Sequence, residues 1–234
     1  MNELFVIIAA ILPGVILGIY IWRKDPQPEP TLLLVKAVAF GALACIPVAV
    51  VEFIMQNVLF GEGNSPQTLF GSTIDAFFVA ALPEESFKLL ALWLILRKNR
   101  YFDEHIDGIV YAVCVGLGFA TVENTMYLFA NMDDWQSVAC FRALFAVPGH
   151  YAFAVLMGYY YSIYHFVNHT KTNRIKILLI PVLAHGIYDA IIMSVVVEPS
   201  IWFICIFGLI WFCYKVHRYA RDRVIEQVKR GLEA

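Results

Sequence analysis

The sequence of 234 residues carries little charge: 15% of its residues are Asp, Glu, Lys or Arg, and 60% are hydrophobic. A soluble domain has about a quarter of its residues charged and about half apolar. The mean hydropathy of +0.69 therefore excludes an ordinary soluble domain. The alternation of apolar and polar residues typical of a transmembrane β-barrel is also absent. The composition predicts a polytopic helical membrane protein.

Several signatures of other protein classes are missing as well. None of the five cysteines belongs to a CxxC pair, which argues against a disulfide or zinc framework. Neither an HExxH motif nor a GxSxG nucleophile elbow occurs. The N-terminus lacks a basic region and a cleavage site, so we expect it to form the first span. No internal repeat divides the chain, and residues 1–234 are expected to form a single domain with a short basic cytoplasmic tail at about 215–234.

Long apolar runs predict an all-α transmembrane bundle of about seven spans, because a helix needs about 20 residues to cross the hydrocarbon. The expected spans are residues 4–22, 33–60, 69–96, 106–130, 138–166, 175–197 and 201–214. The turns after the first, third and fifth spans contain Lys and Arg, whereas the turns after the second, fourth and sixth contain only acidic charges. The positive-inside rule then places the N-terminus outside and the C-terminus in the cytoplasm.

The most unusual stretch is Pro83–Lys88, which places two carboxylates and an ammonium inside an apolar span. Each ionised group at membrane depth costs about 2.5–3.5 kcal/mol on translocon-insertion scales. No structural need explains that cost, so we interpret Glu84 and Glu85 as functional residues. Glu84 and Lys88 are four residues apart and share a helix face, which allows Lys88 to neutralise this carboxylate.

Other titratable groups are expected at a similar depth on three further spans: Glu123, His150, and the pair His185 and Asp189. Because His185 and Asp189 are four residues apart on a helix, the carboxylate can accept the second N–H of the imidazole. Prolines precede several of these groups and favour a bent helix beside a hydrated cavity. The candidate catalytic residues are thus Glu84, Glu85, Glu123, His150, His185 and Asp189. Two further deep acids, Glu52 and Asp75, are interpreted as structural.

Water in such a cavity favours hydrolysis, with a buried carboxylate that takes a proton from water. Glu123, His150 and His185 could supply two imidazoles and a carboxylate to a catalytic zinc ion, with Glu84 or Glu85 as the base. The same residues could instead work without metal, as in a glutamic protease. Because the ligands would come from three separate helices, their spacing does not decide, and no cofactor is assigned.

Several linked motifs resemble the PrsW family of intramembrane proteases. They are EExxK at Glu84–Lys88, FDEHIDGIVY at Phe102–Tyr111, GLGFATVEN at Gly116–Asn124, the later His150, and HGIYD at His185–Asp189. The order of the motifs also matches, and the likeness covers nearly the whole chain.

The same residues are more distantly similar to the type II CAAX prenyl endopeptidases (the Abi family), although Glu123 stands where that family has histidine. This second resemblance implies that Glu84 activates water and that His185 with Asp189 faces the oxyanion. Lys88, Asn124 and Arg142 are expected to support the site.

The PrsW resemblance implies a site-1 protease that cuts a membrane-spanning anti-sigma factor in the bacterial cytoplasmic membrane. The expected partners are this single-pass substrate and the lipid bilayer, with no nucleic acid. An alternative from another class is a proton-coupled transporter or channel, since buried acids and histidines also relay protons. That alternative predicts repeated halves, which we do not find in the sequence.

Overall fold

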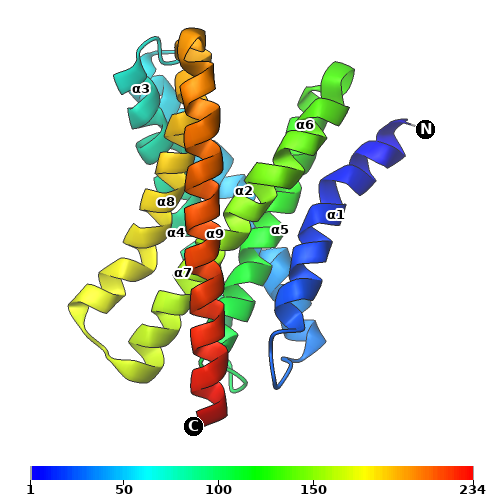
Figure 1. The fold of residues 1–234 in the computed structure, drawn as a ribbon, viewed down its shortest axis with the longest axis vertical. Coiled ribbons are helices and arrows are strands. Elements are labelled where there is room, and N and C mark those ends of the chain that lie inside the picture. Colours follow the sequence, from blue (N-terminus) through cyan, green and yellow to red (C-terminus); the bar gives the residue numbers. More distant parts are fainter. Residues whose placement is uncertain (1, 234) are drawn as a thin grey trace.

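The computed structural model describes residues 2–233, and these residues form an all-α bundle without a strand, as predicted. The helices run mainly along one axis, with the N- and C-termini at opposite ends (Figure 1). The elements are α1 (Asn2–Trp22), α2 (Thr31–Phe60), α3 (Leu69–Ile74), η1 (Asp75–Ala81), α4 (Leu82–Leu96), α5 (Asp107–Ala130), η2 (Met132–Asp134), α6 (Trp135–Phe141), η3 (Arg142–Ala146), α7 (Val147–Ser162), η4 (Ile163–Val167), α8 (Lys171–Val197), η5 (Pro199–Ile201) and α9 (Trp202–Glu233).

Six helical segments in the described part of the chain are long and apolar enough to cross a membrane. The remaining predicted span, 69–96, is continuously helical through α3, η1 and α4. Because it contains four charged residues, this segment is not apolar enough to be counted with the other six. Three of them, Glu84, Glu85 and Lys88, belong to the stretch that the sequence singles out, and the fourth is Asp75.

The turns divide the bundle into two chemically different ends. The turns that follow α1, α4 and η4 lie at the same end as the C-terminus (Figure 1). The first two carry Lys and Arg, and the third leads into Lys171, Arg174 and Lys176 of α8, so we call this the basic end. The opposite end carries the N-terminus and the turns with Glu62, Asp133, Asp134 and Glu198, and we call this the acidic end.

The predicted boundary between the seventh span and the basic tail lies inside one helix. α9 continues without a break from Trp202 to Glu233. The reason is an apolar stripe at helical spacing that passes through Leu209, Ala220 and Val224, each of which is buried against the bundle. The first half of the tail therefore packs as part of the bundle.

Helix α5 lies at the centre and packs against α1, α2, α4 and α7. Close approach depends on its glycines: a Cβ placed on Gly118 would lie 2.1 Å from the carbonyl oxygen of Val38 on α2, and one on Gly116 would lie 2.7 Å from the Cβ of Ala154 on α7. Both contacts are shorter than van der Waals distances allow. These two glycines therefore permit the close packing of α5 on α2 and α7.

Gly118→Ala is therefore expected to destabilise the bundle, because the backbone of α2 would have to move away. Overpacking of this kind costs about 1–3 kcal/mol. Thermal unfolding in detergent should show a lower midpoint for Gly118→Ala than for the wild type.

The matched control is Gly208→Ala on α9, where an added Cβ meets no atom within 4 Å. Its midpoint should stay equal or rise slightly, because Ala is favoured over Gly in a helix by about 1 kcal/mol. Equal midpoints for Gly118→Ala and wild type would contradict the close α2–α5 packing.

Candidate active site

Two of the site residues follow π-helical segments directly. η1 ends at Ala81, just before Pro83 and Glu84, and η3 ends at Ala146, just before Pro148 and His150. Proline has no N–H to donate and crowds the preceding turn, which favours a local departure from α-helical geometry. π segments are frequent at functional sites because they rotate the following residues relative to the rest of the helix. Here they turn Glu84 and His150 into the interior of the bundle.

The centre of the site is the ammonium of Lys88, which is 3% exposed. Its Nζ atom lies 2.8 Å from Glu84 Oε2, 2.9 Å from Glu85 Oε1 and 3.1 Å from His150 Nδ1. All three ammonium hydrogens thus have a partner, and the Phe119 ring covers the group at 4.1 Å from its centroid. The predicted Glu84–Lys88 pair is confirmed, but Lys88 also binds the second carboxylate.

His185 is held by acids on both ring nitrogens. Its Nδ1 atom lies 2.9 Å from Glu85 Oε1, and its Nε2 atom lies 3.2 Å from Asp189 Oδ2. The Phe153 ring stacks on the imidazole at a centroid distance of 4.9 Å. The predicted pairing of His185 with Asp189 is confirmed, and the pair is fixed in position by contacts on both edges and one face.

A second series of polar contacts holds His150 on the side of the ring opposite Lys88. Its Nε2 atom lies 2.7 Å from Glu123 Oε2, and the same oxygen accepts a hydrogen bond from Arg142 Nη2 at 2.9 Å. Arg142 Nε donates to Asn124 Oδ1 at 2.7 Å, and Asn124 Nδ2 donates to the Ala10 carbonyl at 2.9 Å. Helices α1, α5, η3 and α7 are thereby linked through one continuous network.

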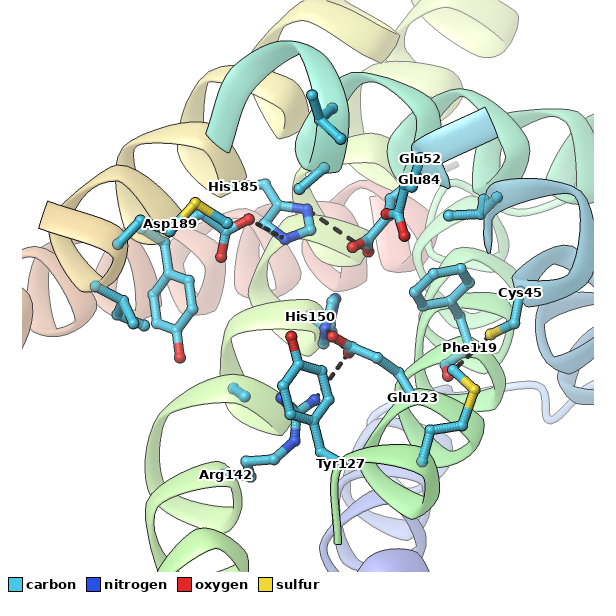
Figure 2. A pocket seen from close by; sticks show the side chains of 18 of the residues that line it. Cys45, Glu52, Glu84, Phe119, Glu123, Tyr127, Arg142, His150, His185 and Asp189 are labelled. Atoms are coloured by element: carbon cyan, nitrogen blue, oxygen red, sulfur yellow. Dashed lines mark hydrogen bonds and ion pairs between the residues drawn. The ribbon is translucent and has the colours of Figure 1, made fainter. Parts of the chain in front are cut away.

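These groups surround a cavity of about 910 Å³ (Figure 2). Glu84, Glu123, His150, His185 and Asp189 line it, whereas Glu85 lies behind the wall and is 1% exposed. The cavity therefore separates the two adjacent glutamates, which the sequence alone does not distinguish.

The cavity wall also includes two acids that we interpreted from the sequence as structural, Glu52 on α2 and Asp75 in η1. Tyr127 and Tyr188 line it as well. The only sequence feature that could have assigned these two acids to the site was their position inside apolar runs. Nothing in the sequence indicated which way the tyrosines face.

Four residues of the site could hold a metal ion together: one ligand atom each from Glu84, Glu85, His150 and His185 lie within 4.8 Å of one another. This set contains Glu84 and Glu85 in place of the predicted Glu123, whose Oε2 is bound by His150 and Arg142.

The chemistry of this donor set fits zinc. Each histidine directs Nδ1 toward Lys88 or Glu85 and presents Nε2 to an outer carboxylate, Glu123 or Asp189. Carboxylate–histidine pairs of this kind orient metal ligands, and two imidazoles with a carboxylate are a common zinc set. In addition, Glu85 Oε2 is buried and has no hydrogen-bond partner. Lys88 contacts three of the four donors, so its ammonium occupies the same centre that a metal ion would use.

Comparison with known proteins shows the family. Residues 29–214 match the family model described as PrsW family intramembrane metalloprotease. The chain is 34% identical to Protease PrsW of Oceanobacillus iheyensis over 215 residues, which cover 88% of this chain and 95% of the relative. It is 36% identical to Protease PrsW of Clostridioides difficile over 82% of this chain and 80% of the relative. For Protease PrsW of Bacillus subtilis the identity is 32% over 81% of this chain and 83% of the relative.

No solved structure matches the chain. The apolar helices together with these relatives identify a multi-pass integral membrane peptidase of bacteria. The chain belongs to the PrsW family of intramembrane proteases.

Proposed function

We propose that this peptidase hydrolyses a peptide bond of a single-pass membrane protein with a water molecule activated by Glu84. The observation that carries the proposal is the convergence of the Glu84 carboxylate and two imidazoles, those of His150 and His185, on a single cavity inside the bundle. Glu84 is the base in this account because it lines the cavity, whereas Glu85 does not.

The neighbours of Glu84 suit proton transfer. Lys88 Nζ lies 2.8 Å from its Oε2 atom and holds the carboxylate in place, where it can take a proton from water. The same carboxyl group can then donate that proton to the leaving amine. Glu85, held by Lys88 and His185, positions these two partners instead of meeting the substrate.

We further propose that Glu85, His150 and His185 would hold a zinc ion. When bound, such an ion would supply Lewis-acid polarisation of the scissile carbonyl and of the attacking water. The donor set supports this: Glu85 Oε2 is buried without a partner, and His150 and His185 each hold Nε2 against an outer carboxylate. The ion would take the place of the Lys88 ammonium, which contacts three of the same four donors.

The cavity extends toward the acidic end of the bundle. This supports cleavage of the substrate in that half of the membrane. The cavity wall continues from the level of Glu84 to Gln56, Ser137 and Val196, which lie near the acidic end of their helices. By the positive-inside rule this is the extracytoplasmic side. A site-1 cleavage of an anti-sigma factor, as the family resemblance implies, requires access from that side.

Glu84→Gln should abolish cleavage while the protein still accumulates in the membrane, because glutamine cannot take the proton from water. General-base catalysis contributes about 10²–10⁴-fold, so the rate should fall by at least about 10². The measurement is cleavage of a tagged single-pass substrate in cells, normalised to the amount of enzyme in the membrane.

Glu62→Gln is the matched control, since Glu62 is exposed in the turn after α2 and lies outside the cavity. It should cleave like the wild type. Undiminished cleavage by Glu84→Gln would refute the assignment of the base, and a loss of ion flux with intact cleavage would favour the transporter alternative.

Metal content should separate the two glutamates. We expect purified wild-type protein and Glu84→Gln to contain stoichiometric zinc, and Glu85→Gln and His185→Ala to lose it, because the last two changes remove proposed ligands. Elemental analysis of the four proteins, with cleavage assays before and after chelation, provides the measurement. Full activity of a wild-type protein free of metal would instead establish a glutamic mechanism.

A further inference from the structure

A second group of buried acids lies at the basic end of the bundle, away from the cavity. Asp25 and Glu29 belong to the turn between α1 and α2, Glu104 belongs to the turn between α4 and α5, and Asp107 begins α5. Asp25 and Glu29 are each 6% exposed and Asp107 is 1% exposed. Along α5, Asp107 lies about 24 Å from Glu123 at 1.5 Å per residue, so this cluster is separate from the candidate active site.

No basic side chain neutralises these carboxylates: among residues 2–233, none of the four forms an ion pair with Lys, Arg or His. Burial raises the pKa of Asp25 and Glu104, and raises that of Glu29 to about 7. The charged forms are therefore costly here, and the cluster needs either protons or a cation.

One oxygen of each acid is already used by the chain. Asp25 Oδ1 accepts from the Gln27 backbone N–H at 3.0 Å, and the Gln27 side-chain amide donates to Glu104 Oε1. Asp107 Oδ2 accepts from the backbone N–H groups of Asp103 and Glu104 at 3.0 and 2.6 Å. The hydroxyl of Tyr111 donates to Glu29. These contacts fix the orientation of the carboxylates.

Three of the remaining oxygens have no partner. Asp25 Oδ2, Glu104 Oε2 and Asp107 Oδ1 are buried and accept no hydrogen bond. One ligand atom from each of these three residues lies within 4.8 Å of the others. Oxygens that bind one Ca²⁺ at about 2.3–2.6 Å can be about 5 Å apart at most, so a single ion can reach all three.

We propose that Asp25, Glu104 and Asp107 bind a hard divalent cation, Ca²⁺ or Mg²⁺, that joins the turn after α1 to the start of α5. An all-oxygen ligand set selects this class of ion over zinc or copper. The ion balances the buried charge and ties together two turns that precede α2 and α5. Its role is structural, because it lies far from the cavity.

The test uses the full-length protein in detergent after treatment with EDTA, titrated with CaCl₂ or MgCl₂ while the thermal midpoint is followed. We expect a saturable rise in the midpoint for the wild type. Asp25→Asn and Asp107→Asn should each weaken the response by roughly tenfold or more, as expected when a metal site is disrupted. Asparagine keeps the oxygen that accepts the backbone N–H, so both variants are expected to fold.

Two controls locate the effect. Asp133→Asn, at the acidic end, should respond like the wild type, and so should His185→Ala, which alters the candidate active site. Luminescence of bound Tb³⁺, displaced by CaCl₂, provides a second measurement that follows the ion itself.

Two results would overturn the proposal. One is a response of equal size in wild type, Asp25→Asn and Asp107→Asn. The other is no saturable response of the wild type at millimolar concentration. A higher midpoint of the metal-free Asn variants would then show that the cluster holds protons.

Discussion

The structure depends most on one ammonium group, that of Lys88, inside an apolar bundle. It joins the two carboxylates of α4 to His150 of α7, and Glu85 carries the connection on to His185 of α8. Removing one partner of a buried ion pair typically costs about 3–5 kcal/mol, because the other charge stays uncompensated. Lys88 therefore makes the costly carboxylates compatible with the fold and sets the distances within the site.

A second set of contacts holds the same site from outside. Glu123 and Asp189 each bind the Nε2 atom of a histidine, and Arg142 connects Glu123 to Asn124 and so to α1. The polar groups are thus fixed before a substrate arrives, which is the usual requirement for electrostatic catalysis in a low-dielectric environment. The close packing of α5, made possible by glycines such as Gly118, keeps these helices in register.

The sequence predicted much of this arrangement for a physical reason. Charged residues in apolar spans are costly enough to be conspicuous, and pairs four residues apart on a helix must share a face. The Glu84–Lys88 and His185–Asp189 contacts followed from these two rules. The packing of the tail half of α9 against the bundle was not foreseen, because charged residues surround its apolar stripe.

The sequence alone did not predict which side chains of different helices contact one another. The shared role of Lys88 between Glu84, Glu85 and His150 depends on how α4 and α7 are rotated about their axes, and the π segments before both helices alter that rotation. For the same reason the sequence could not show that Glu84 faces the cavity and Glu85 does not, or that Glu52 and Asp75 line its wall.

We propose that this chain, without a further protein, cuts a single-pass protein from a cavity that extends toward the acidic end. The most direct measurement combines the purified protein and a purified single-pass substrate in liposomes, with mass spectrometry of the products. We predict two fragments whose masses sum to the substrate plus one water, with the cut on the extracytoplasmic side or in the adjoining half of the membrane. Absence of cleavage in this two-protein system, or a cut in the half next to the basic end, would contradict the account.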